Sequence, residues 1–141
     1  MGSKIRFDYT AIGDTVNLAS RLEGLNKIYG TNVLVSQFTL ENIKNHSIPV
    51  TFIEIDSVKV KGKEKPVRIF TFLEKNSTSM KIKETYEKAL LLYRKGRFRE
   101  AANIFRKVCN FPPAKLMLYR CKELIKENPE KWDGVFTHKT K

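Results

Sequence analysis

The stretch TFIEIDSVKVKGKEKPVRIFTFL, residues 51–73, decides the fold of this chain. Its two ends, residues 51–60 and 67–73, are rich in Phe, Ile and Val, and the second alternates in the way a half-buried strand does. Between them, Gly62 and Pro66 interrupt any regular element and mark a turn. The stretch therefore predicts a β-hairpin whose loop carries several lysines.

Helices and a strand are predicted on the N-terminal side of this hairpin. Asp14 or Thr15 can cap a first helix, which is expected to end in a turn at residues 29–32. A short strand is then predicted at residues 32–36, and a second helix at residues 37–45. Four apolar residues of the first helix share one face: Val16, Ala19, Leu22 and Leu25. Helices that alternate with strands predict a mixed α/β (α+β) fold.

Helices alone are predicted on the C-terminal side. The polar run at residues 76–79 predicts a linker, and helical stretches follow at about 81–95, 98–109 and 113–127, with Gly96 separating the first two. Five side chains are expected to pack across that break: Tyr86, Ala89, Tyr93, Ala101 and Phe105. The pattern resembles a tetratricopeptide hairpin, but such repeats need neighbours to bury their faces. Residues 75–80 are therefore expected to link a basic helical appendage, residues 81–141, to the rest.

The net charge of +12 is concentrated in this second half. Residues 1–74 carry 10 basic and 8 acidic side chains, whereas residues 75–141 carry 17 and 7. Such a surface can attract nucleic acid, anionic lipid or protein, or it can be simply a solvated helical face.

No apolar run approaches the ~20 residues of a membrane span, and no signal peptide is visible. A cytoplasmic location is therefore expected, with upstream regions able to anchor the complete protein. Cys109 and Cys121 match no metal-ligand spacing and are expected to be buried free thiols.

The segment with the clearest chemical pattern is FDYTAIGDTVNLASRLE, residues 7–23. Gly13 and Asp14 allow a tight entry into a helix, and Asn17 and Arg21, four residues apart, project from one face of it. An amide beside a guanidinium suits an anion with hydroxyl neighbours, because Arg offers a rigid fork to phosphate oxygens. The alternative is a surface Asn and a salt-bridged Arg.

This segment resembles the signature of the class III adenylyl and guanylyl cyclases, in which a Tyr and a base-selecting residue precede Gly-x-Thr-Val-Asn-x-Ala-Ser-Arg. The matching residues are Tyr9, Gly13, Thr15, Val16, Asn17, Ala19, Ser20 and Arg21. Residues 58–63, VKVKGK, resemble the closing hairpin of the same catalytic domain. The resemblance covers residues 1–74 as the C-terminal half of that ferredoxin-like domain, and the helical stretches with residues 132–135 look like tails on some bacterial cyclases.

The resemblance implies a role for four residues. Asn17 would orient the ribose and Arg21 would stabilise charge on the phosphate in the transition state. Lys61 would bind the polyphosphate. Thr10 occupies the base-selecting position, where a hydroxyl favours ATP over GTP, with a guanylate cyclase as the alternative.

It also implies an adenylate cyclase in signal transduction that works as a head-to-tail homodimer and converts ATP to cyclic AMP and pyrophosphate. Mg²⁺ or Mn²⁺ would be held by two Asp residues of the preceding half of the catalytic domain. The present sequence does not include that half. Asp8 and Asp14 do not match those metal positions, so no metal ligand is assigned. The chain alone is therefore expected to be inactive.

Two other functions compete with this interpretation. A nucleic-acid binder is disfavoured because the chain lacks an RNP-like motif, a zinc knuckle or a clear recognition helix. A protein-interaction module built on the helices is compatible with a cyclase, and the tail would then contact a protein or an anionic surface.

Overall fold

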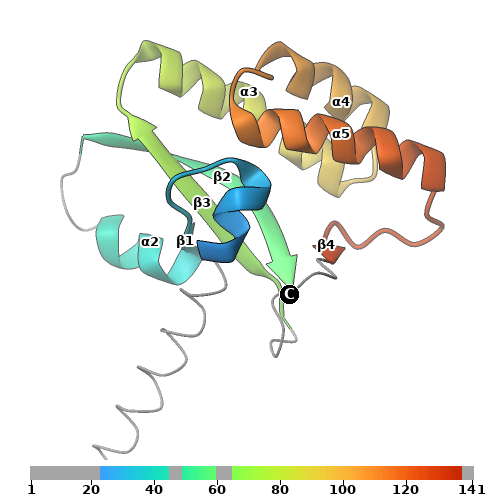
Figure 1. Cartoon of the computed structure of the whole chain (residues 1–141), viewed down its shortest axis with the longest axis horizontal. Helices are drawn as coiled ribbons and strands as arrows, with labels where there is room; N and C mark the ends of the chain where they lie inside the picture. The colour runs from blue at the N-terminus through green and yellow to red at the C-terminus, as the bar shows by residue number, and fades with distance from the viewer. Residues whose placement is uncertain (1–22, 45–48, 60–64, 138–141) are drawn as a thin grey trace, which may run out of the picture.

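The computed structural model describes residues 23–44, 49–59 and 65–137 as a sheet with helices packed against it (Figure 1). The sheet has the strand order β1-β3-β2-β4, with β4 parallel to β2 and the other pairs antiparallel. This arrangement confirms the mixed α/β class. The strands are β1 (Val35–Ser36), β2 (Val50–Lys59), β3 (Val67–Glu74) and β4 (Phe136–Thr137), and the helices are residues 23–29, α2 (Gln37–Lys44), α3 (Ser77–Arg94), α4 (Phe98–Lys107) and α5 (Pro112–Glu127).

The predicted hairpin is formed by β2 and β3, and one irregularity in it has a large effect. Glu54 is paired with Phe70 and Asp56 with Ile69, so β2 carries one extra residue, Ile55, between them. Such a β-bulge inverts the alternation of side chains along the strand. As a consequence Asp56 lies opposite the buried Ile69, on the core side of the sheet.

The start of α3 differs from the prediction of a linker at residues 76–79. The Asn76 side chain accepts a hydrogen bond from the Ser79 backbone N–H at 2.7 Å, and Ser79 Oγ accepts one from the Asn76 N–H at 3.1 Å. These two bonds form a capping box, so α3 begins at Ser77, before the predicted residue 81. The prediction was wrong because Asn and Ser favour helix caps as strongly as loops.

The α3–α4 break occurs where it was predicted, and the two cysteines differ. Gly96 has φ +83°, the left-handed conformation that glycine adopts without a Cβ clash. Helix α4 ends at Lys107, before the predicted end at residue 109, so Cys109 lies in a turn and is exposed. The prediction of a buried thiol is wrong for Cys109 and confirmed for Cys121.

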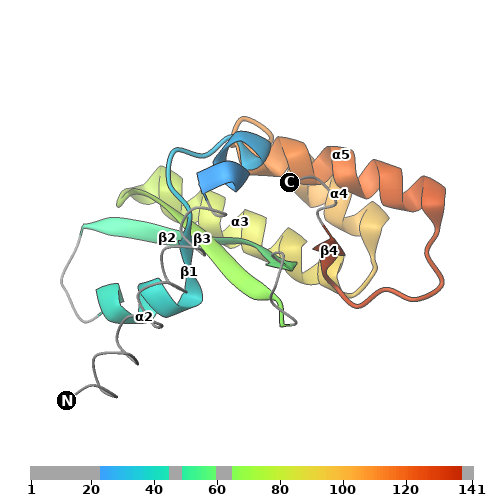
Figure 2. The ribbon, with the colours of Figure 1, turned by 60° about the horizontal axis from the view of Figure 1, so that its bottom comes forward.

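One hydrophobic core joins the sheet to helices α3–α5, which gather on one side of the β2–β3 hairpin (Figures 1 and 2). The five residues predicted to pack between α3 and α4 are all buried, as predicted. The same cluster contains Tyr29, Ile53, Ile55 and Ile69. The residues predicted to form an appendage thus share their core with the sheet, because the apolar face of the hairpin needs a cover and these helices supply it.

Helix α3 also covers the edge of β2. Lys83 Nζ donates to the Phe52 carbonyl at 2.6 Å, Tyr86 OH donates to the Ile55 carbonyl at 2.8 Å, and a Glu87 carboxylate oxygen accepts from the Glu54 N–H at 3.0 Å. Further along, β4 pairs with β2. An uncovered strand edge invites association with other chains, and these contacts remove that hazard at β2.

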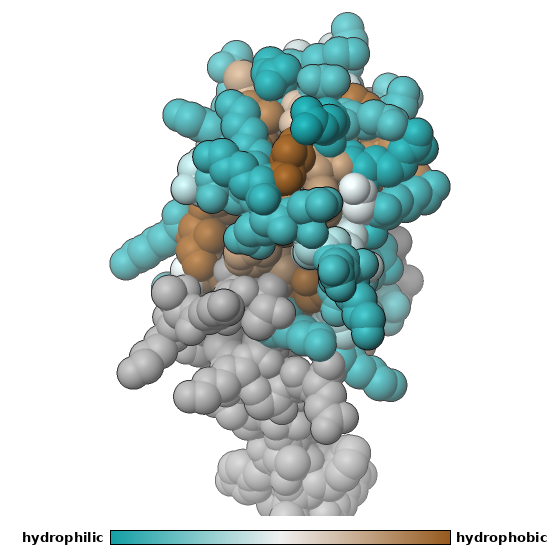
Figure 3. All heavy atoms as spheres, turned by 90° about the vertical axis from the view of Figure 1, so that its right-hand side faces the viewer, coloured by the Kyte–Doolittle hydropathy of each residue, from teal (hydrophilic) through white to brown (hydrophobic). Residues whose placement is uncertain are grey.

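The side of the molecule where α4, α5 and β4 lie is largely hydrophilic (Figure 3). Arg106 and Lys107 of α4 and Lys115 and Lys122 of α5 are exposed. Within the residues that can be described, no helix has the length and apolar character needed to cross a membrane.

Candidate functional site

The four predicted site residues, Thr10, Asn17, Arg21 and Lys61, all lie outside the described residues. Their roles therefore stay predictions. The structure does describe the segments next to them in sequence: the helix at residues 23–29 follows Arg21, and β2 precedes Lys61.

The helix at residues 23–29 is anchored in the core by its last turn. Leu25 and Tyr29, four residues apart, are buried, while Lys27 between them is exposed. The Gly30 N–H donates to the Asn26 carbonyl at 2.8 Å, and Gly30 has φ +71°, which ends the helix at the predicted stop. The apolar stripe predicted from the sequence is confirmed at Leu25.

Tyr29 reaches a buried carboxylate, Asp56 of β2. Tyr29 OH donates to Asp56 Oδ2 at 2.6 Å, and Arg120 Nη1 of α5 donates to the same oxygen at 2.6 Å. Arg120 Nη2 also lies 3.4 Å from Tyr29 OH, to which it donates. We call Tyr29, Asp56 and Arg120 the Asp56 cluster; its members are 0%, 0% and 4% exposed.

Other groups complete the surroundings of this cluster. The Ser57 N–H donates to Asp56 Oδ1 at 2.8 Å, so both carboxylate oxygens have partners. The guanidinium carbon of Arg120 lies 4.0 Å from the centre of the Phe136 ring, a cation–π contact with β4. Arg120 Nη1 also approaches Met117 Sδ at 3.5 Å. A buried charge is tolerated when it is paired and hydrogen-bonded in this way.

Burial sets the protonation of the neighbouring groups. It raises the pKa of Tyr29 well above the ordinary value, and the charge of Asp56 raises it further. Burial by itself lowers the pKa of Arg120, but the acidic groups Tyr29 and Asp56 more than offset this, and the pKa is raised. Burial also raises the pKa of the Cys121 thiol to about 12. These groups therefore hold one protonation state near neutral pH, which suits a structural ion pair and not proton transfer.

A second charged group joins the helical appendage, residues 81–141 and called the tail from here on, to β2. Arg94 of α3 forms an ion pair with Glu54 and donates to Ser57 Oγ at 3.1 Å, and Arg68 binds Glu54 through Nε at 3.1 Å and Nη2 at 2.8 Å. Burial alone raises the pKa of Glu54, but the two guanidinium groups outweigh it and lower that pKa. Glu54 is thus ionised at neutral pH and holds α3 against the hairpin.

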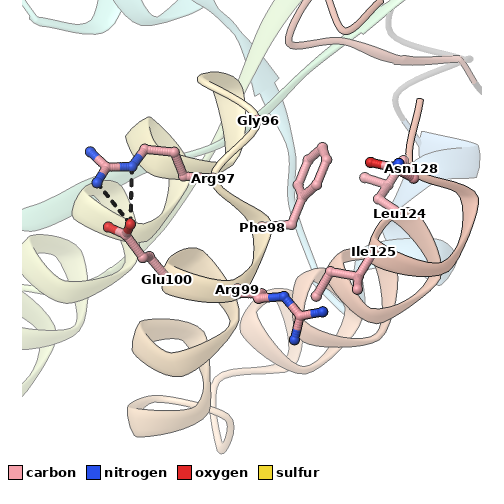
Figure 4. Close-up of a pocket in the computed structure, with 8 residues that line it drawn as sticks. All are labelled: Gly96, Arg97, Phe98, Arg99, Glu100, Leu124, Ile125 and Asn128. Carbon is pink, nitrogen blue, oxygen red and sulfur yellow. Dashed lines mark hydrogen bonds and ion pairs between the residues drawn. The ribbon is translucent and has the colours of Figure 1, made fainter. Parts of the chain in front are cut away.

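A cavity of about 540 Å³ lies between the start of α4 and the end of α5 (Figure 4). The acid that lines it, Glu100, is paired with Arg97 at 2.7 Å. Its lining offers no nucleophile next to a base, so we assign it no chemistry. The lining residues are Gly96, Arg97, Phe98, Arg99, Glu100, Leu124, Ile125 and Asn128.

Metal-ligating residues do not gather in the part of the chain that the structure describes: no group of three or more His, Cys, Asp or Glu there could hold an ion. The four residues that were expected to act on the nucleotide, Thr10, Asn17, Arg21 and Lys61, are not of these four residue types.

Sequence reasoning did not single out the Asp56 cluster. A signal was present, since Asp56 interrupts an apolar strand, FIEIDSVKV, and Arg120 interrupts an apolar helical stretch, LMLYRCKEL. Each stretch holds other charges as well, namely Glu54 and Lys59 in the strand and Lys122 and Glu123 in the helix. Because charged residues are mostly exposed, nothing marks Asp56 or Arg120 as the buried one, and neither residue indicates its partner 64 positions away.

Three curated proteins are similar in sequence to this chain. One, the adenylate cyclase of Dictyostelium discoideum described as terminal-differentiation specific, is 35% identical over 136 residues, which cover 89% of this chain and 6% of that protein. Adenylate cyclase 1 of Rhizobium meliloti is 46% identical over 70 residues, 50% of this chain and 10% of that protein. The adenylate cyclase of Anabaena cylindrica is 44% identical over 71 residues, 50% of this chain and 14% of that protein.

The chain thus spans a small part of the length of each of these relatives. No protein-family model matches it, and no solved structure matches it. The similarity to the Dictyostelium protein covers so much of this chain that it must include most of the residues beyond 74. The aligned part therefore includes most of the sequence that forms helices α3–α5 in this chain. Taken together, these three relatives support a class III adenylyl cyclase-like domain in this chain.

Proposed function

We propose that this chain is part of an adenylate cyclase that converts ATP to cyclic AMP and pyrophosphate in signal transduction. The similarity to three proteins named adenylate cyclase is the observation that carries this proposal. Their names also favour ATP over GTP, in agreement with a hydroxyl at Thr10.

The reaction is an intramolecular phosphoryl transfer. The ribose 3′-oxygen attacks the α-phosphorus, the bond from that phosphorus to the β-phosphate oxygen breaks, and pyrophosphate leaves. Such chemistry needs positioning and neutralised charge more than covalent help from the protein. Asn17 orients the ribose, Arg21 meets the charge that grows on the α-phosphate, and Lys61 binds the polyphosphate.

The remaining parts of the site come from outside this chain. Mg²⁺ or Mn²⁺ would neutralise charge on the phosphates, with ligands from the preceding half of the catalytic domain. The complete domain works as a head-to-tail homodimer. For these reasons the chain by itself produces no cyclic nucleotide.

A cyclase assay with ATP and Mn²⁺ tests the proposal on two samples, the intact protein and the isolated chain. We expect turnover only from the intact protein, lost on Asn17→Ala and retained on Arg97→Ala, which removes an exposed charge of the tail. Absence of cyclic AMP from the intact protein would refute the proposal. A preference for GTP would show that Thr10 does not select the base as proposed.

A further inference from the structure

We propose that Arg120 is a positioning residue for the cyclase reaction, so that helix α5 makes the tail part of the catalytic unit. This inference rests on the proposed function. It concerns a residue that carries no chemistry itself and that acts through Asp56.

The Asp56 cluster joins three segments of the chain. Tyr29 ends the helix at residues 23–29, eight positions after Arg21, and Asp56 lies on β2, five positions before Lys61. Arg120 comes from α5, far away in sequence. Both segments that meet Arg120 therefore lead directly to residues proposed to bind the nucleotide.

The β-bulge that places the Asp56 carboxylate in the core indicates that the ion pair has a role beyond packing. Without the β-bulge at Ile55, Asp56 would continue the alternation of the strand and point to the opposite side of the sheet from Ile53. Apolar side chains in place of both Asp56 and Arg120 would stabilise the core as well as the ion pair or better, because two buried charges must lose their hydration. A buried ion pair fixes geometry more narrowly than apolar contacts do, since the Arg fork must meet Asp56 and Tyr29 together.

Strand β4 contacts the same end of β2 and also contacts Arg120. Phe136 of β4 stacks on the Arg120 guanidinium and pairs with Val58, and Thr137 pairs with Lys59, two positions before Lys61. The tail therefore holds the strand end that leads to Lys61 through both a helix and a strand. A shift of about 1 Å in a positioning contact can lower a rate about a hundredfold, so loosening these contacts should slow the reaction.

The test separates positioning from stability in the intact protein. Arg120→Met alone leaves Asp56 as an unpaired buried charge and can unfold the protein. The double variant D56N/R120M removes both charges and keeps a polar partner for Tyr29. We expect D56N/R120M to retain a urea midpoint near that of the wild type while kcat with ATP falls about tenfold or more.

Two further variants sharpen the result. Arg120→Lys keeps the charge but not the fork, and kcat should lie between those of the wild type and D56N/R120M. Arg97→Ala, which removes an exposed tail charge, should leave both kcat and the midpoint unchanged.

Each outcome decides the question. A folded D56N/R120M with the kcat and KM of the wild type would overturn the inference, and so would an equal loss of kcat in Arg97→Ala. A variant series in which kcat follows the urea midpoint would show that Arg120 is only structural. Absence of cyclic AMP from the wild-type protein would refute the proposed function instead, and this inference with it.

Discussion

Replacing Phe105 by alanine should destabilise the helices and the sheet together. Phe105 of α4 is 0% exposed and packs edge-on against Tyr86 of α3, with ring centres 5.2 Å apart. Tyr86 in turn binds the Ile55 carbonyl of β2, so the ring sits one contact away from the sheet. Loss of Phe105 therefore opens a space in the middle of the shared core.

The magnitude follows from this burial. A Phe→Ala change at a fully buried site costs about 3–5 kcal/mol, because the removed ring loses its burial and the surroundings collapse only partly. The lower part of this range requires Tyr86 to move into the space, which its hydrogen bond to β2 opposes. A small domain is stable by roughly 5–15 kcal/mol, so this loss is a large share of the total.

Urea unfolding of the chain measures the effect with two probes. Trp132, the single tryptophan, packs against Tyr93 and Phe98 and reports on the helices. Amide hydrogen exchange in β2 and β3 reports on the sheet. Both probes should show one coincident transition that shifts to lower urea in Phe105→Ala.

Leu91→Ala is the matched control, since Leu91 of α3 is 54% exposed and should change stability by no more than about 0.5 kcal/mol. The reasoning fails if Phe105→Ala costs as little as Leu91→Ala. It fails equally if the fluorescence transition shifts while the exchange of the sheet stays the same, because the helices would then be a separate unit.

Three more predictions concern charges. Arg120→Met in the chain should cost about 3–5 kcal/mol of unfolding free energy and D56N/R120M much less, because only the single variant leaves a buried charge unpaired; equal losses in a urea titration would show that the pair is not coupled. Glu54 has a lowered pKa in the folded chain, so its contribution to stability is full above its ordinary value of 4.5 and is lost as the pH falls through the folded pKa. The difference in urea midpoint between the wild type and Glu54→Gln should therefore be largest near pH 7 and should shrink as the pH falls below 4.5, and a difference independent of pH would contradict this. In the intact protein, Arg21→Ala should lower kcat by a factor on the order of 10²–10³ with KM nearly unchanged. Lys61→Ala should instead raise KM at least as much as it lowers kcat. Steady-state kinetics in which Arg21→Ala changes only KM would make Arg21 a ground-state contact.

Local signals account for the elements that the sequence predicted well. The hairpin could be recognised because Gly62 and Pro66 separate two β-branched and aromatic runs, and the α3–α4 break because only glycine takes the φ of residue 96 easily. The start of α3 was missed for an equally local reason, since Asn76 and Ser79 are typical of both caps and loops. Such ambiguity is resolved by the bonds the side chains make.

The candidate site divides in the same way. Asn17, Arg21, Thr10 and Lys61 were identified because a nucleotide site needs set residue types at set spacings, and a short segment can carry that pattern. The relatives support the family, and the roles of these residues stay predictions. Nothing in the segment indicates which distant residues hold it in place.

The sequence by itself determined the class of this protein, since strand and helix periods, turn residues and the cyclase signature are all readable within a few neighbouring positions. Only the tertiary structure decided that the helices share a core with the sheet and that Arg120 neutralises Asp56. The reason is physical. A single extra residue at Ile55 reverses which side of β2 faces inward, and the partner of the charge it buries lies 64 positions away. No local pattern records either fact, because burial depends on what packs against a strand and not on the strand alone.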